Sequence, residues 1–373
     1  MTKASGLYIG LMSGTSADAI DAALVRFSGD GYELLALESC TYSVDLQQTI
    51  KRMMQAGTVN LDALGQIDTA IATAFAHTVN TLLTKHHIAA DTIIAIGSHG
   101  QTIRHLPPAP DASTLGFSMQ LGDPNTIVAQ TSIDVIADFR RADMAHGGHG
   151  APLAPAFHQF AFKDQKHFGV LNLGGIANIT LFSEGEITAW DTGPASTLMD
   201  AWIYQHQGVS FDDEGQWAAS GNVDQALLKA LLQHPYFKLS PPKSTGFETF
   251  NMDWLNSQLQ TFAKTISSAD VQATLLALTA TSIANSIADA QLATLIICGG
   301  GGYNTFLIEQ LRSLLPTTNI QSSETFGVNP QAVEAIAFAW LAWRHKQGLA
   351  GNIPSVTGAS KAVVLGGLYP KPF

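Results

Sequence analysis

The sequence is poor in cysteine and in long apolar runs. Only two cysteines, Cys40 and Cys298, occur among 373 residues, so neither a disulfide framework nor a cysteine metal cluster is expected. No apolar run reaches the roughly 18 residues that a membrane helix needs. No charged region precedes a long apolar segment at the start, so no signal peptide is indicated. We therefore expect a cytoplasmic protein that does not bind membranes.

Basic residues are also scarce. The chain has 19 lysines and arginines against 30 acidic residues, a formal net charge of −11. This balance argues against a general nucleic-acid binder. It leaves room for an anionic ligand, because backbone amides can hold phosphate without any lysine.

The chain is too long for one ordinary core, and 46% of its residues are hydrophobic, which predicts two globular domains. Each half opens with an apolar strand, a glycine-containing turn and a second strand, as in residues 7–27 and 168–182. Helices and further strands follow in both halves. The pattern predicts an α/β protein with two domains of similar plan. His146 and His149 flank two glycines, and without further ligands nearby they do not predict a metal site.

Three glycine-containing turns, Ser13–Asp18, Asn172–Asn178 and Gly299–Asn304, each follow an apolar strand. Glycine permits positive φ and lets backbone amides approach a ligand, and successive amides can form an anion-binding concavity. Asp18 could hold Mg²⁺, directly or through water. The alternative is that they are plain tight turns. The chain carries neither a P-loop nor a complete dinucleotide fingerprint.

Nine ordered blocks of the sequence resemble anhydro-N-acetylmuramic acid kinases. They are MSGTSADAID (12–21), IGSHGQTIRH (96–105), DFRRADMAHGGHGAPLAPAFH (138–158), LNLGGIANIT (171–180), WDTGP (190–194), PKSTGFETFN (242–251), ICGGGGYN (297–304), EAIAFAWLAWR (334–344) and GNIPSVTGA (351–359). The resemblance implies the actin-like ATPase and sugar-kinase superfold, with two RNase H-like domains around a cleft. We expect the first domain to comprise residues 1–138 with 341–373, and the second residues 139–340.

The resemblance also implies an activity. ATP, water and 1,6-anhydro-N-acetylmuramate would give N-acetylmuramate 6-phosphate and ADP, a step of peptidoglycan recycling. ATP and Mg²⁺ are the expected cofactors, a small sugar is the expected partner, and a homodimer is implied. Two alternatives stay open, which are another sugar or sugar-acid kinase of the same superfold and a non-catalytic module switched by a nucleotide.

Site residues follow from the matching blocks. Asp191 is expected to be the general base that activates water. The expected ATP and phosphate contacts are Gly14, Thr15, Ser16, Asp18, Asn172, Gly174, Gly175, Gly299, Gly300, Gly301 and Asn304, with Asp18 also the expected Mg²⁺ ligand. The expected substrate contacts are Ser98, His99, Gln101, Arg140 and Glu334.

Several of these residues have simpler interpretations. Asp191 could be a helix N-cap and Asp18 an Asx-turn residue. Arg140 could pair with a substrate carboxylate, but a solvated surface charge is the alternative for Arg141 and for either arginine, and the sequence does not decide which of the two contacts the substrate. Two alanines, Ala19 and Ala195, stand where the family usually has glycine. If either position needs positive φ, alanine there costs about 1 kcal/mol or more.

Overall fold

The computed structural model describes residues 5–372, apart from residues 15, 30, 109–114, 242 and 263–264. It divides into two compact units: Met1–Ala161 with Ala332–Phe373 form unit 1, and Phe162–Gln331 form unit 2. These boundaries differ from the predicted ones after residues 138 and 340. The reason is that the helix before Ala161 and the whole of helix α12 (Val333–Lys346) pack with unit 1.

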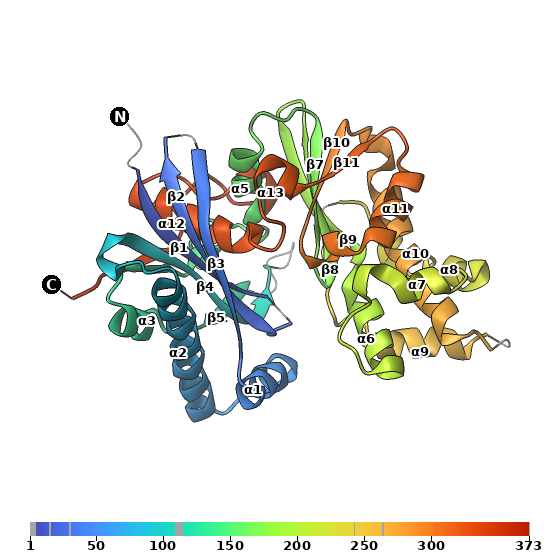
Figure 1. Cartoon of the computed structure of the whole chain (residues 1–373), viewed down its shortest axis with the longest axis horizontal. Helices are drawn as coiled ribbons and strands as arrows, with labels where there is room; N and C mark the ends of the chain where they lie inside the picture. Colours follow the sequence, from blue (N-terminus) through green and yellow to red (C-terminus); the bar gives the residue numbers. More distant parts are fainter. Residues whose placement is uncertain are drawn as a thin grey trace. The chain divides into compact units, whose positions relative to one another are not determined.

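The sheet of unit 1 has seven strands among the described residues (Figure 1), in the order β12-β6-β4-β1-β2-β3, with β5 paired to β4. The strands are β1 (Gly6–Ser13), β2 (Ala19–Ser28), β3 (Gly31–Thr41), β4 (Ile93–Leu106), β5 (Phe117–Leu121), β6 (Val135–Ala137) and β12 (Gly367–Tyr369). Strands β1 to β3 form an antiparallel meander, and β4 and β6 extend the sheet in parallel.

The sheet of unit 2 repeats this order as β11-β10-β7-β8-β9. Its strands are β7 (Phe168–Leu173), β8 (Ile176–Ser183), β9 (Glu186–Pro194), β10 (Thr294–Cys298) and β11 (Asn319–Ser322). Again the first three strands are antiparallel and the last two are added in parallel. This shared order is that of an RNase H-like domain, so the predicted α/β class with two such domains is confirmed.

Helices cover both faces of the sheet in unit 1 (Figure 1). They are α1 (Val44–Gln55), α2 (Leu61–Lys85), α3 (Pro124–Thr131), α4 (Phe139–Met144), α5 (Ala154–Ala161), α12 (Val333–Lys346) and α13 (Pro354–Thr357), with a short 3₁₀ turn at Ala90–Thr92. Apolar residues of α2 and α3 pack on one face. On the other, α12 lies so close to the strands that a Cβ at Gly10 or Gly97 would collide with its backbone. Glycine is therefore required there for α12 to reach the sheet.

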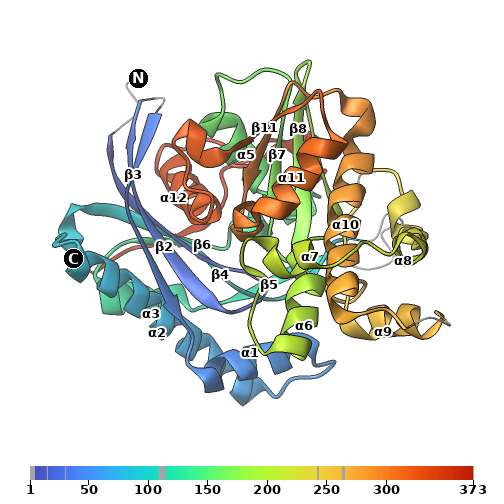
Figure 2. The same ribbon diagram turned by 45° about the vertical axis from the view of Figure 1, so that its right-hand side comes forward.

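The helices of unit 2 are α6 (Ser196–Gln207), α7 (Gln216–Ser220), α8 (Gln225–Leu231), α9 (Met252–Gln260), α10 (Ser268–Ile287) and α11 (Thr305–Leu314). Short 3₁₀ turns span Asp213–Gly215, Pro235–Lys238, Ala288–Ala290, Gly300–Tyr303 and Ser323–Phe326. The longest, α10, runs beside the sheet (Figure 2) and packs with β7, β8 and α6 in one core.

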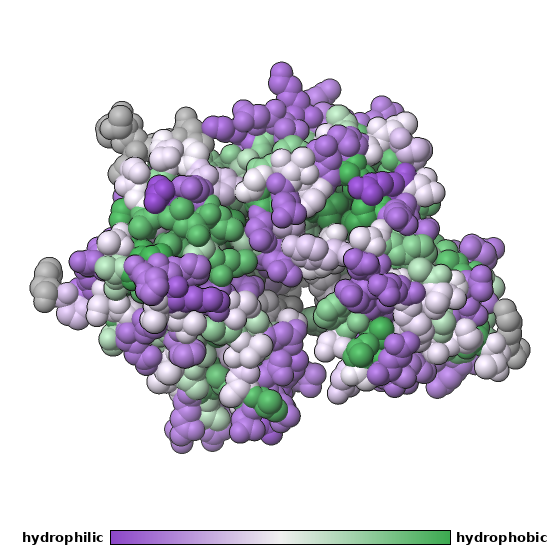
Figure 3. Space-filling model, viewed as in Figure 1, coloured by the Kyte–Doolittle hydropathy of each residue, from purple (hydrophilic) through white to green (hydrophobic). Residues whose placement is uncertain are grey.

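One segment, Ser268–Ala290, is long and apolar enough to cross a membrane, but 72% of its most apolar window is buried. Such burial is typical of the core helix of a globular unit. On the face shown in Figure 3, hydrophilic residues are interspersed with hydrophobic ones over both units. This mixture accords with a chain in which only 13% of residues are charged.

Strand β4 is long enough to carry several of the predicted site residues. It continues through Ser98, His99 and Gln101 to Leu106. Its second half is kept in the sheet by antiparallel pairing with β5. At the junction Gly100 has a φ of +75°, which a residue with a side chain would adopt only under strain.

Candidate functional site

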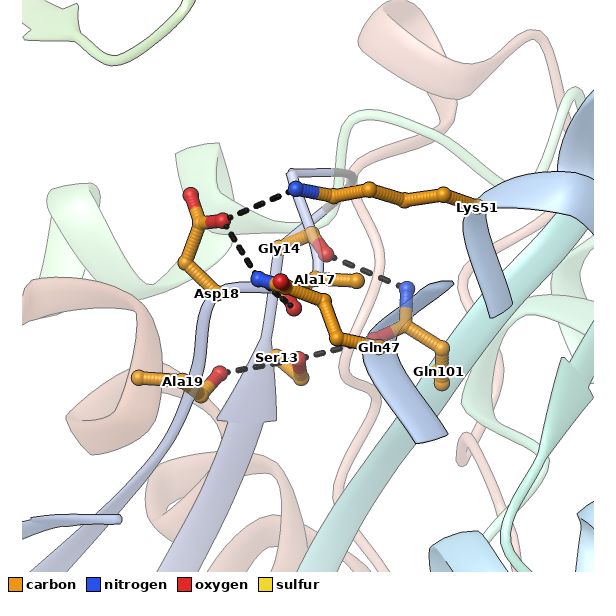
Figure 4. Close-up of polar contacts among 8 residues, drawn as sticks. All are labelled: Ser13, Gly14, Ala17, Asp18, Ala19, Gln47, Lys51 and Gln101. Carbon is orange, nitrogen blue, oxygen red and sulfur yellow. Dashed lines mark hydrogen bonds and ion pairs between the residues drawn. The ribbon is translucent and has the colours of Figure 1, made fainter. Parts of the chain in front are cut away.

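The first turn joins β1 to β2 and rests on Gln101 (Figure 4). The Gln101 amide nitrogen donates to the carbonyls of Gly14, at 3.1 Å, and Thr102, at 3.3 Å. Its oxygen accepts from Ser13 Oγ at 2.8 Å and from Tyr42 Oη at 3.2 Å. A glutamine side chain has two donors and two acceptor positions, so its capacity is used within unit 1. The structure thus gives Gln101 a role in holding the turn, and its substrate contact stays a prediction.

Asp18 lies exposed at the end of this turn and has two polar neighbours from α1 (Figure 4). Its Oδ1 accepts from Gln47 Nε2 at 3.0 Å and lies 3.2 Å from Lys51 Nζ. Ser16 is also exposed, and Thr15 lies outside the described residues. Among those described, no three histidines, cysteines or carboxylates gather as a metal site. One exposed carboxylate is nevertheless the kind of ligand that Mg²⁺ takes together with phosphate oxygens and water.

The second and third turns are neighbours in unit 2. They follow the parallel strands β7 and β10, whose register pairs Asn172 with Cys298. Gly299 has a φ of +83°, and a Cβ there would lie 2.5 Å from Asn172 Oδ1. A Cβ at Gly301 would lie 2.8 Å from Leu173 Cβ. Glycine therefore lets these two turns come together, as expected for two parts of one ligand site.

Two groups in these turns are engaged in the fold. The Asn304 carboxamide oxygen accepts from Leu307 N at 2.9 Å and so caps α11. The carbonyls of Gly174 and Gly175 accept amides from the start of α6, including that of Ala195 at 2.9 Å. Gly300 is exposed, and a Cβ there would meet no atom within 4 Å.

Asp191 lies in β9, the edge strand that pairs with β8, and is partly buried. It does not cap α6, because the N-cap position is Ala195. Instead its Oδ2 accepts the amide of Thr245 at 3.0 Å. Burial raises the pKa of Asp191 to about 6, the Thr245 hydrogen bond opposes this rise, and the charge of Glu248 adds to it. A carboxylate with such a pKa is suited to accept a proton near neutral pH.

A segment from Lys243 to Glu248 wraps around Asp191. The Asp191 amide donates to the carbonyl of Lys243 at 3.1 Å, and its carbonyl accepts from Tyr236 Oη at 2.6 Å. Together with the Thr245 amide on the carboxylate, these hydrogen bonds engage the amide, the carbonyl and the side chain of Asp191. Such fixation orients a general base before substrate arrives.

In unit 1, Arg140 is anchored to His99. Its Nε and Nη2 lie 3.1 and 3.0 Å from His99 Nε2, and its Nη1 donates to the carbonyl of Gly150 at 2.9 Å. Arginine has no acceptor, so His99 Nε2 accepts. Burial lowers the pKa of His99 well below its usual value, and the charge of Arg140 acts in the same direction. His99 is therefore neutral and carries its proton on Nδ1.

Glu334 is exposed in the first turn of α12. One turn further along, the Phe338 ring packs against His99 with the ring centroids 4.7 Å apart and the ring planes tilted by 41°. Burial lowers the pKa of Arg140 to about 10, and the charge of Glu334 partly offsets this. Arg140 is therefore a fixed cation, and Glu334 is part of its electrostatic environment.

A pocket of about 410 Å³ opens in unit 1 and includes His99 in its lining, whereas Arg140 and Glu334 do not line it. It is lined by Ser98 and His99 of β4, Asp68 of α2, and Asp138 and Arg141 at the start of α4, among others. In the described part of the chain, the buried Ser98 hydroxyl and His99 Nδ1 have no hydrogen-bond partner. Buried polar atoms are normally paired, so both are suited to bond a polar ligand. The volume falls in the range of about 300–1,000 Å³ that small-molecule sites occupy.

Comparison with known proteins identifies the family. A family model described as anhydro-N-acetylmuramic acid kinase matches residues 6–371. The chain belongs to the anhydro-N-acetylmuramic acid kinase family. The anhydro-N-acetylmuramic acid kinases of Shewanella sp. (strain MR-4) and Shewanella oneidensis are each 50% identical over 366 residues, covering 97% of this chain and 98% of theirs.

Among solved structures, (R)-2-hydroxyglutaryl-CoA dehydratase component A of Acidaminococcus fermentans aligns with a TM-score of 0.49 at 12% identity. It covers 91% of this chain and 98% of its own. Membership of the anhydro-N-acetylmuramic acid kinase family confirms the predicted enzyme class, a phosphotransferase that acts on an alcohol group.

The two departures from the family pattern are accommodated without left-handed backbone. Ala195 has a φ of −109°, and Ala19 begins strand β2. Neither is among the described residues of positive φ, whereas Ala17, with a φ of +52°, is. The strain that the sequence suggested at Ala19 and Ala195 is therefore absent from this backbone.

Sequence reasoning missed three residues of this site: Gln47, Lys51 and Thr245. The first two reach Asp18 from a helix about thirty residues further along the chain, and Thr245 reaches Asp191 across a longer separation. The KSTGFE stretch was part of the family resemblance. Because it has no catalytic residue type in a familiar spacing, its residues carried no predicted role.

Proposed function

We propose that this chain uses ATP to convert 1,6-anhydro-N-acetylmuramate into N-acetylmuramate 6-phosphate in peptidoglycan recycling. The observation that carries the proposal is the carboxylate of Asp191. It is partly buried, held by the Thr245 amide, not used as a helix cap, and has a raised pKa. This combination is typical of a group kept for proton transfer.

In the proposed reaction Asp191 takes a proton from water as the water oxygen bonds to C1 of the sugar. The C1–O6 bond breaks, and O6 bonds to the γ-phosphorus of ATP as the bond to ADP breaks. Positioning and proton transfer by one carboxylate contribute about 10²–10⁴-fold. The anhydro ring opens and the phosphoryl group is transferred without an oxidant or reductant.

The turns are proposed to bind the nucleotide. The exposed turn ending at Asp18 and the joined turns at Asn172–Gly175 and Gly299–Gly301 offer backbone amides to phosphates. Asp18 would hold Mg²⁺, directly or through water. When bound, the ion neutralises charge on the phosphate oxygens.

The pocket in unit 1 is proposed to take the sugar. Ser98 and His99 would bond its polar groups. Arg140 would pair with the carboxylate of the lactyl ether, because its guanidinium is held by two partners. Arg141 is the other candidate, because it lines the pocket whereas Arg140 reaches it only through His99; its side chain is 55% exposed and lies 3.5 Å from Asp138.

The test is turnover of 1,6-anhydro-N-acetylmuramate with ATP and Mg²⁺ in ¹⁸O-labelled water, set against a panel of free hexoses. We expect ADP, a 6-phosphate and label on the anomeric oxygen. Product without label would overturn the hydrolytic step. Turnover of a free hexose instead would favour another sugar kinase, and nucleotide binding without turnover would favour a switch module.

Two further properties are proposed from the family resemblance. The chain would act in the cytoplasm, where ATP is available, and would form a homodimer. Light scattering coupled to size-exclusion chromatography would give the mass in solution, and a value near 39.6 kDa would contradict the dimer.

A further inference from the structure

Asp143 is a fully buried carboxylate at the end of α4. Its Oδ1 accepts from Asn352 Nδ2 and from Thr357 Oγ1, both at 2.7 Å. Its Oδ2 accepts the amide of Gly150 at 2.8 Å. Burying a carboxylate is costly unless it is well hydrogen-bonded. These three bonds therefore join α4, the glycine loop 146–150 and the C-terminal segment 352–357.

The same loop carries a bond to Arg140. Asp143 holds the Gly150 amide, and the Gly150 carbonyl accepts from Arg140 Nη1 at 2.9 Å. A second tie joins the loop to the C-terminal segment, because the His149 amide donates to the carbonyl of Thr357 at 2.7 Å. Gly150 itself has a φ of +72°. Its main chain is thus fixed from both sides.

The bonds of Arg140 leave a defined pair of donors. A guanidinium has five N–H groups. Arg140 donates one N–H from Nε and one from Nη2 to His99 Nε2, and one N–H from Nη1 to the carbonyl of Gly150. Within the described residues, each terminal nitrogen therefore keeps one N–H without an acceptor. One N–H on each terminal nitrogen is the donor set with which a guanidinium can meet the two oxygens of a carboxylate.

We propose that Asp143 and Thr357 are positioning residues for the carboxylate of the substrate. They hold Gly150, and Gly150 together with neutral His99 sets the direction of the Arg140 fork. This inference rests on the proposed function, in which Arg140 meets the lactyl carboxylate. It assigns the C-terminal segment, which lies far from the phosphate turns in sequence, to recognition of the sugar.

The test compares Thr357→Val with Thr357→Ser. Valine keeps the shape of threonine but removes the hydroxyl that bonds Asp143, whereas serine keeps the hydroxyl. In Thr357→Val we expect the KM for 1,6-anhydro-N-acetylmuramate to rise about tenfold while the KM for ATP stays within about twofold, because a loosened charged pair weakens one contact only. Thr357→Ser should restore the wild-type KM. If the valine variant does not fold, Thr357→Ala replaces it.

Lys346→Met is the matched structural control. Lys346 bonds Asp134 at 2.7 Å with both side chains largely buried, and this pair also links α12 to the rest of unit 1. Its loss should lower the thermal midpoint without changing the KM for the sugar. If the KM for the sugar rises as much in Lys346→Met as in Thr357→Val, then loss of stability alone explains the rise in both variants.

A second substrate isolates the carboxylate. 1,6-Anhydro-N-acetylglucosamine lacks the lactyl group, so Thr357→Val and the wild-type chain should turn it over with the same KM. An equal loss with both sugars, or an unchanged KM for the muramate, would overturn the inference. Failure of the wild-type chain to turn over the muramate would overturn the proposed function, and the inference with it.

Discussion

The side-chain nitrogen of Gln101 donates to the carbonyl oxygen of Gly14, 3.1 Å away. The bond links strand β4 to the turn after β1, although 87 residues separate the two in sequence. Gln101 is fully buried, and Ser13 and Tyr42 bond its oxygen. The side-chain amide of Gln101 therefore fixes the conformation of the first turn.

Replacing Gln101 with leucine should disturb nucleotide binding. Leucine fills similar space but removes the acceptor of the Tyr42 hydroxyl and the donor to the Gly14 carbonyl, while Ser13 Oγ keeps its bond to the Ala19 carbonyl. Such a loss costs about 1–3 kcal/mol of unfolding free energy. With its support lost, the turn should bind ATP about tenfold more weakly, as a change near 1.4 kcal/mol gives. Thermal unfolding and the KM for ATP measure the two effects.

Gln272→Leu is the control for this variant. Gln272 is also fully buried, and its nitrogen bonds Asp212 in unit 2, which in turn accepts the amides of Trp217 and Ala218. It should lose stability with an unchanged KM for ATP. If Gln101→Leu behaves in the same way, Gln101 supports the fold but not the nucleotide.

The pH dependence of the reaction should report Asp191. A general base must be unprotonated, so kcat/KM should rise with pH and reach half its maximum near pH 6, where the pKa of Asp191 lies. Asp191→Asn should bind ATP normally and lose about 10²–10⁴-fold in kcat. Isothermal titration and steady-state kinetics separate binding from turnover, and near-normal turnover would remove Asp191 from this role.

The same substitution should stabilise the chain. The pKa of Asp191 is raised from 3.8 to about 6 on folding, so the folded state holds this proton more tightly than the unfolded state. Ionisation therefore costs stability, a cost that grows as pH rises from about 4 to about 6 and is constant above. Asp191→Asn should unfold at a higher temperature than wild type at pH 8, with no such difference at pH 4.

Glu248→Gln should move the acid limb of the activity profile to lower pH. The negative charge of Glu248 raises the pKa of Asp191, and glutamine removes the charge while keeping the size. The thermal midpoint should change little, since Glu248 is exposed. Glu309→Gln on α11 removes the same charge elsewhere in unit 2 and should leave the profile in place. A profile identical in all three proteins would show that Glu248 does not influence the base.

The strand order was predictable because it depends on local patterns. Residues 7–27 and 168–182 each show an apolar strand, a glycine turn and another strand, and both became the first hairpin of a unit. The second and third turns, which follow β7 and β10, lie close together because parallel strands end at the same edge of a sheet. The position of Asp191 in the third strand, next to that hairpin, follows in the same way.

The partners of individual side chains could not be predicted. Which residue bonds Gln101 or Asp191 depends on segments brought together only by tertiary packing, such as Tyr42 and Thr245. The backbone strain that the sequence suggested at Ala195 is absent for a related reason. Its φ of −109° is set by hydrogen bonds to the neighbouring turn, and no residue type in the sequence reveals those bonds.

Lys51 offers the last prediction, because the sequence showed no lysine in the phosphate turns and the fold brings one there. Its ammonium lies 3.2 Å from Asp18 Oδ1, and the two side chains are 46% and 63% exposed. Exposed pairs of this kind contribute about 0–1 kcal/mol to stability. Lys51→Met should therefore unfold at the wild-type temperature.

Its KM for ATP, however, should rise about five- to tenfold, because a cation beside the first turn would be lost from the phosphates. Lys51→Arg should keep most of the affinity, since the charge remains. Lys85→Met breaks another ion pair of unit 1, which joins the last turn of α2 to Glu38 of β3 at 2.7 Å, and it should leave the KM unchanged. If Lys51→Met binds ATP as tightly as wild type does, then the amides and the ion at Asp18 suffice to hold the phosphates, and Lys51 merely pairs with Asp18.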